Sequence, residues 1–143
     1  MRWVLLDEIV SIIRHKKAIA RSRVPQSPYS PELLMVEMMA QTGAVLLGAE
    51  MDYSEDLIFA KIEEAEFLKE LPPGTPLDIE ASSDNLHAAG AWIEGKVFSS
   101  GVLIGEAKLL LMCVGHFLAG NLEPITFHPA FMDYFQVRSK MID

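Results

Sequence analysis

The stretch of residues 30–50, SPELLMVEMMAQTGAVLLGAE, constrains the fold more than any other part of the sequence. Ser30 is a favourable N-cap, and Pro31 suits the first helical position, where its missing N–H costs nothing. The residues that follow are apolar on nearly every face, which is typical of a helix buried on all sides. The sequence therefore predicts one long helix enclosed by the rest of the chain.

Two polar side chains, Glu37 and Gln41, interrupt the middle of this helix. They are four residues apart and therefore share one helical face. A carboxylate inside a buried helix is costly unless a partner satisfies it. Glu37 is therefore a candidate functional residue. The alternative is a structural glutamate that is hydrogen-bonded to backbone groups across a dimer interface.

Strand-like segments surround the helix and predict an α+β fold with an antiparallel sheet wrapped around one long central helix. A short amphipathic helix is expected over 129–137, with Phe131, Tyr134 and Phe135 on its apolar side. We expect a single domain, with a core over 2–114 and a C-terminal extension over 115–143. The expected strands cover 9–14, 16–24, 57–68, 76–87, 88–99 and 102–114.

The charge of the chain limits its partners. The net charge of −8 argues against general binding to nucleic acid. Five of the twelve basic residues nevertheless fall within ten positions, and form either a solvated strand face or a docking patch for an acidic partner. These five residues are Arg14, Lys16, Lys17, Arg21 and Arg23.

A single cysteine, Cys113, permits no disulfide within the chain, which favours a reducing, cytoplasmic location. No signal peptide is apparent. The apolar stretch at 102–119 contains Glu106 and Lys108, so no membrane span is expected there. The histidines and the cysteine are too scattered for a metal site, and no glycine-rich phosphate loop occurs, so we expect no cofactor.

Three motifs, in this order and spacing, resemble those of a known family. They are RWVLLDEI at 2–9, LLMVEMMAQTG at 33–43 and FAKIEEAEFLKELPPGTPL at 59–77. Together they resemble the hot-dog-fold 3-hydroxyacyl-acyl-carrier-protein dehydratases of the FabZ/FabA type. The resemblance extends over residues 2–114, and the glutamate at position 37 favours the FabZ side.

The resemblance implies a hot-dog fold, a homodimer or larger assembly, and a (3R)-hydroxyacyl thioester of acyl carrier protein, or of coenzyme A, as substrate. Dehydration needs a base for the C2 proton, an acid for the C3 hydroxyl and donors for the thioester oxyanion. Glu37 matches the family's catalytic carboxylate. The substrate-binding positions implied are Gln41, Glu32, Leu33 and Phe59, where Glu32 occupies the place of a glycine whose backbone N–H serves the oxyanion.

The family's catalytic histidine has no counterpart, because no histidine lies between Lys16 and Met51. Two alignments are possible. Without a gap, Arg23 falls at the position of the catalytic histidine. If residues 26–29 are aligned with the family's proline segment instead, the loop that carries the histidine is deleted. Arg23 cannot act as a base, since a guanidinium stays protonated. The sequence therefore leaves three hypotheses. They are a divergent dehydratase or hot-dog thioesterase that relies on Glu37, a non-catalytic subunit that binds acyl carrier protein or an active paralogue, and a structural dimer.

Overall fold

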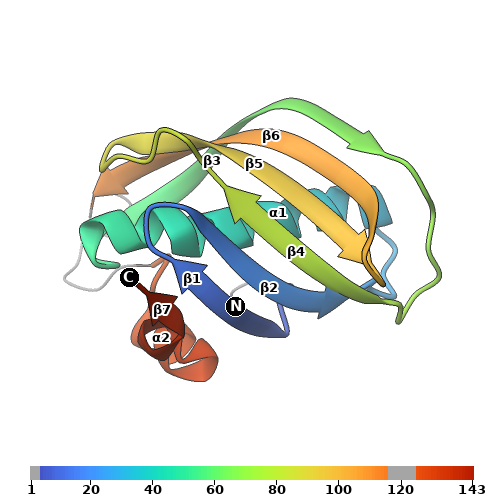
Figure 1. Cartoon of the computed structure of the whole chain (residues 1–143), viewed down its shortest axis with the longest axis horizontal. Helices are drawn as coiled ribbons and strands as arrows, with labels where there is room; N and C mark the ends of the chain where they lie inside the picture. The colour runs from blue at the N-terminus through green and yellow to red at the C-terminus, as the bar shows by residue number, and fades with distance from the viewer. Residues whose placement is uncertain (1–3, 116–124) are drawn as a thin grey trace.

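The computed structural model describes residues 4–115 and 125–143. Its strands curl around one long helix, α1, and a small C-terminal unit lies near the end of that helix (Figure 1). The helical elements are α1 (Pro31–Gly48), η1 (Ala49–Met51), α2 (Pro129–Phe135) and η2 (Val137–Lys140). The strands are β1 (Glu8–Ile13), β2 (Lys17–Arg23), β3 (Asp56–Phe67), β4 (Pro76–Ser82), β5 (Gly90–Ser99), β6 (Val102–Gly115) and β7 (Met141–Ile142).

Helix α1 begins as its sequence predicts. The Ser30 hydroxyl accepts a hydrogen bond from the Leu33 N–H at 3.4 Å, and Pro31 occupies the first turn. The helical segment ends after η1, where Asp52 adopts a left-handed conformation with φ 54°. By length and composition the helical segment Pro31–Met51 could cross a membrane. However, 72% of its 18-residue apolar stretch is buried inside the fold. It is therefore placed as a core helix.

The seven strands form one sheet in the order β3-β6-β5-β4-β2-β1-β7. The six long strands pair antiparallel, as expected, whereas β7 pairs parallel with β1 and makes the sheet mixed. The expected antiparallel sheet is therefore confirmed for these six strands, and β7 adds one parallel pair at its edge. A strand of two residues carries too little hydrophobic periodicity to be predicted.

Glycines allow α1 to lie close against the concave face of the sheet. A Cβ atom at Gly95 of β5 would lie 2.6 Å from the Met39 sulfur, and one at Gly43 of α1 would lie 2.9 Å from an Ile93 carbon. The largest side chains of this core are fully buried on both sides of the contact. They include Met38, Met39, Leu46, Ile79, Ile93 and Leu109.

The predicted end of one strand and the predicted position of Tyr134 were wrong. The strand expected over 76–87 ends at Ser82, because the Ser83 hydroxyl donates to the Trp92 carbonyl at 2.7 Å and accepts from the Asn85 N–H at 3.3 Å, which turns the chain. The helix expected over 129–137 is confirmed as α2, with Phe135 buried. Tyr134, expected on its apolar side, is instead 75% exposed.

Candidate functional site

Glu37 lies in the middle of α1 and is half-buried, whereas its neighbours Val36 and Met38 are buried. Gln41, one turn later, donates a hydrogen bond from Nε2 to Glu37 Oε1 at 3.2 Å. This contact is what the spacing of four residues predicts on a helix. The two polar residues therefore act as one unit on the helical face.

The N-terminal segment fixes the orientation of the Gln41 amide. The Leu5 N–H donates to Gln41 Oε1 at 2.9 Å, so the carbonyl side of the amide is occupied. An amide has its donor and acceptor on opposite sides, and Gln41 must therefore present its NH₂ group to Glu37. The backbone at Leu5 thus positions the carboxylate through Gln41.

An apolar cavity of about 230 Å³ opens beside Glu37. Its wall combines one face of α1, the start of β3, the N-terminal segment and the C-terminal segment that precedes and includes α2. The lining residues are Val4, Glu37, Ala40, Gln41, Ala44, Leu57, Ile58, Phe59, Leu111, Thr126, Phe127 and Phe131. Among these described residues, Glu37 is the one titratable side chain, in a lining that is otherwise mostly carbon.

Burial raises the pKa of Glu37, because desolvation penalises its charged form, and the hydrogen bond from Gln41 opposes that rise. A carboxyl group with a raised pKa holds a proton more readily at working pH. It can then donate that proton to a leaving hydroxyl, or accept one as a carboxylate. The cavity thus supplies an acid–base group at the edge of an apolar volume.

The structure brings together three of the predicted site residues, Glu37, Gln41 and Phe59. Leu33 lies one turn before Glu37 but is 54% exposed and outside the cavity lining. Glu32 is at the helix N-terminus, where its carboxylate accepts a hydrogen bond from the Ser30 hydroxyl at 2.8 Å. Within one chain, Glu32 and Leu33 therefore lie apart from the cavity.

The five basic residues lie on β2 and in the turn that precedes it, outside the cavity lining, and four of them make ion pairs inside the chain. These pairs are Arg14–Asp143 at 3.1 Å, Lys17–Glu80 at 3.4 Å, Arg21 with Glu8 and Asp78 at 3.5 Å each, and Arg23–Asp7 at 4.0 Å. Lys16 is exposed and makes no ion pair with the described residues. Much of the local positive charge is therefore balanced within the fold.

The sequence did not predict that the C-terminal segment contributes Thr126, Phe127 and Phe131 to the cavity. The apolar spacing of Phe131 and Phe135 was visible, but it could not say against which surface they pack. His116 follows β6 directly in the sequence but lies outside the described residues, so its position relative to Glu37 is not described.

Neither a cysteine nucleophile nor a metal centre is supported by the described part of the chain. Burial raises the pKa of Cys113 to about 11, so its thiolate is scarce at neutral pH. No group of three or more metal-binding side chains gathers among residues 4–115 and 125–143. Glu37 remains the one acid–base group among the described residues that line the cavity.

Comparison with curated proteins relates the chain to one set of enzymes, although no family model matches it. The 3-hydroxyacyl-[acyl-carrier-protein] dehydratase FabZ of Campylobacter lari is 36% identical over 129 residues, covering 78% of this chain and 88% of that protein. The FabZ of Geobacillus thermodenitrificans is 32% identical over 122 residues, covering 76% of this chain and 83% of that protein.

Solved structures share the fold at low sequence identity. A Streptococcus mutans protein bound to acetyl CoA matches with a TM-score of 0.64 and 13% identity, covering 80% of this chain and 94% of that chain. The dehydratase heterocomplex ApeI:P from Xenorhabdus doucetiae matches with a TM-score of 0.58 and 18% identity, covering 80% of this chain and 85% of that chain. A Haemophilus influenzae thioesterase matches with a TM-score of 0.59 and 14% identity, covering 74% and 77%. The predicted α+β hot-dog fold is confirmed.

Proposed function

Because the chain belongs to the FabZ family of 3-hydroxyacyl-[acyl-carrier-protein] dehydratases, we propose that it binds acyl thioesters and places their C3 hydroxyl against Glu37. The observation that carries this proposal is a half-buried glutamate, oriented by Gln41, at an apolar cavity. An acyl chain would occupy the apolar volume, since burying each methylene contributes about 0.8 kcal/mol. Glu37 would then lie beside the reacting carbons.

Dehydration breaks the C2–H bond and the C3–O bond and forms a C2–C3 double bond. In the proposed reaction Glu37 gives its proton to the leaving hydroxyl, which departs as water. A separate base must take the C2 proton, and the described lining of one chain offers none besides Glu37. We therefore propose altered catalysis, in which solvent or a group from a second subunit receives this proton.

The same cavity favours a second candidate, a non-catalytic subunit that holds an acyl thioester for another protein. The specific observation is the absence of histidine and tyrosine from the described lining, where apolar side chains dominate. Thioester hydrolysis is a third outcome, in which the Glu37 carboxylate would activate a water. These candidates share one ligand class and differ in the product that they release.

An assay of the purified protein with a 3-hydroxyacyl thioester of acyl carrier protein separates these candidates. We expect enoyl thioester to form, at a rate about a hundredfold or more below that of a histidine-bearing FabZ, because losing one general base typically costs this much. Mass spectrometry of the carrier would detect the loss of water. A rate equal to that of the relative would contradict altered catalysis, and free carrier thiol without enoyl product would favour hydrolysis.

We also propose that two chains associate through β3, the edge strand of the sheet. Most of β3 is exposed, including the apolar side chains Ile58, Phe59 and Ile62. An open edge that carries apolar side chains favours pairing with another strand. Because Phe59 lies both on this edge and in the cavity lining, a second chain at β3 would lie next to the site.

Light scattering tests this assembly. We expect the wild-type protein to have twice the mass of one chain at micromolar concentration, and Ile62→Lys to shift the population toward monomer. Ile62 is 45% exposed, so the change adds a charge to the edge without emptying the core. Val102→Lys, at an exposed apolar position beside a turn, serves as the control and should stay dimeric. A monomeric wild-type protein would refute the assembly.

The proposed partner is acyl carrier protein in the cytoplasm, with coenzyme A thioesters as the alternative. The stretch from Arg14 to Arg23 stays the predicted docking surface for an acidic carrier. Lys16 is exposed and makes no ion pair with a described residue, whereas the other four basic residues already contact acidic side chains.

A further inference from the structure

We infer that the C-terminal segment 125–135 forms the end wall of the acyl cavity and limits the length of the chain that the cavity accepts. This inference rests on the proposed function, because it concerns the acyl chain of the same ligand. It assigns to Phe127 and Phe131 a role in specificity. The resemblance to the family ends at residue 114, before this segment begins.

The cavity follows one face of α1 from Glu37 toward the end of the helix. Glu37, Ala40, Gln41 and Ala44 lie at the spacing of a single helical face and all line the cavity. With a rise of about 1.5 Å per residue, Ala44 lies about 10 Å beyond Glu37 along the helix axis. The small side chains at 40 and 44 leave the space that a linear acyl chain requires.

Phe127 closes this face about one turn beyond Ala44. A Cβ atom built at Gly48 would lie 2.5 Å from Phe127 Cζ, so the ring packs directly on the helix backbone. The ring is 3% exposed and meets the Tyr53 ring edge-on at 5.0 Å between centroids. An acyl chain that extends along α1 from Glu37 would therefore meet Phe127.

Phe131 continues the wall from Phe127 toward the surface. Its ring centroid lies 6.2 Å from that of Phe127 and 4.8 Å from that of Phe135. Unlike Phe127, Phe131 is only half-buried, and it lines the cavity from the first turn of α2. Removing its ring would extend the cavity beside Phe127 toward the surface while leaving the inner packing of Phe127 on Gly48 intact.

Polar contacts hold this wall in place from both sides. The Asp56 carboxylate accepts hydrogen bonds from the N–H groups of Ile125 and Thr126, and the Leu57 N–H donates to the Thr126 hydroxyl at 2.9 Å. After α2, Arg138 pairs with Asp52 at 2.6 Å. The segment is thus fixed to the start of β3 and to the turn that follows α1.

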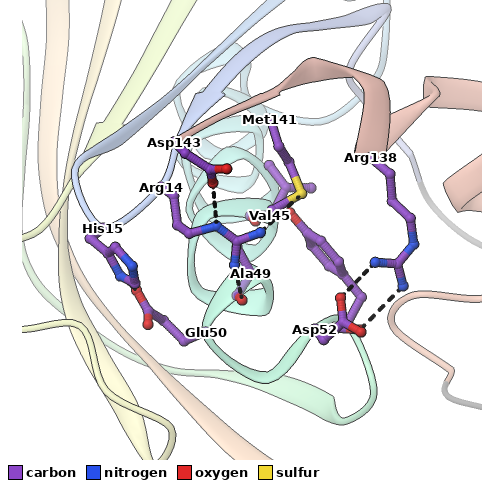
Figure 2. Close-up of polar contacts among 10 residues, drawn as sticks. Arg14, His15, Val45, Ala49, Glu50, Asp52, Arg138, Met141 and Asp143 are labelled. Atoms are coloured by element: carbon purple, nitrogen blue, oxygen red, sulfur yellow. Dashed lines mark hydrogen bonds and ion pairs between the residues drawn. The ribbon is translucent and has the colours of Figure 1, made fainter.

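Contacts at the end of α1 also secure the chain that follows the wall. Figure 2 shows Arg14, in the turn after β1, reaching the Ala49 carbonyl, which it contacts at 3.2 Å, and Asp143, while Arg138 of η2 reaches Asp52. A wall held at both ends can resist displacement by a longer acyl chain. This resistance is what a length limit requires.

The test measures binding of butyryl, hexanoyl, octanoyl, decanoyl and dodecanoyl pantetheine thioesters by calorimetry to the full chain. For the wild type we expect affinity to rise by about fourfold per added methylene while the chain still fits, and then to stop rising. Phe131→Ala should move that limit to longer chains, and Ala44→Leu should move it to shorter ones. Tyr134→Ala is the matched control, since this aromatic side chain of α2 is 75% exposed and outside the lining.

The outcomes separate this inference from the proposed function. A length limit that moves in opposite directions in Phe131→Ala and Ala44→Leu, and stays unchanged in Tyr134→Ala, supports the end wall. Thioester binding with the same limit in all four proteins overturns the end wall and leaves the proposed function standing. If no thioester binds to the wild type at any length, the proposed function fails, and the inference fails with it.

Discussion

Replacing Glu37 by glutamine is expected to lower the rate of dehydration by about a thousandfold, to the background of the assay, because the amide cannot carry the transferred proton. The substitution keeps the shape of the side chain and retains an oxygen that can accept the hydrogen bond from Gln41. Ligand binding should therefore persist. The measurement is enoyl thioester formation, followed together with the affinity for a saturated acyl thioester.

Stability distinguishes a catalytic role of Glu37 from a structural one. Since burial raises the pKa of Glu37, the native state binds its proton more tightly than the unfolded state does. The stability that this group contributes is therefore present at low pH and lost as the pH rises through its raised pKa. Glu37→Gln resembles the protonated form of the side chain, so its melting temperature at neutral pH should be no lower than that of the wild type. If its melting temperature is higher at neutral pH, the difference should become smaller as the pH falls.

A large drop in the melting temperature of Glu37→Gln at neutral pH would contradict the catalytic assignment and favour a structural glutamate. Glu50→Gln is the matched control. Glu50 follows α1 and contacts His15 at 2.6 Å, outside the cavity, so its substitution should leave the rate unchanged.

The half of the site that is local in sequence could be predicted. Ser30 and Pro31 mark the start of α1, and the spacing of four residues between Glu37 and Gln41 predicts the contact that the structure shows. Phe59 came from its place in a family motif. Leu33 shares the helical face of Glu37, but it lies at the uncovered start of α1, so helical phase alone could not show that it is exposed.

The rest of the candidate site depends on contacts between segments that are distant in the sequence, and no local sequence pattern predicts such contacts. Leu5 reaches Gln41 across 36 positions, and Asp56 reaches Thr126 across 70. The sequence shows an apolar residue at 127 and an acidic residue at 56. Neither residue type indicates which distant residue it contacts in the fold. The end of the cavity could therefore be identified only from the three-dimensional arrangement.

Asp56→Ala is expected to destabilise the fold by about 3–6 kcal/mol, because two backbone N–H groups lose a charged acceptor and each such bond is worth about 1.5–3 kcal/mol. Asp56 is fully buried, and its Oδ1 accepts from Ile125 at 2.5 Å and from Thr126 at 2.8 Å. Chemical denaturation measures the loss. Hydrogen exchange at residues 125 and 126 should accelerate in the variant, since the segment loses its anchor to β3.

Asp56→Asn is the control that separates the charge from the acceptor. Asparagine keeps one oxygen for both backbone donors, and the second carboxylate oxygen, Oδ2, is buried without a hydrogen bond from the described residues. The asparagine variant should therefore lose less stability than the alanine variant and keep residues 125 and 126 protected. Equal losses in both variants would show that the negative charge, and not the acceptor geometry, holds the C-terminal segment. Protected amides in Asp56→Ala would show that Phe127 packing on Gly48 is sufficient to keep the wall in place.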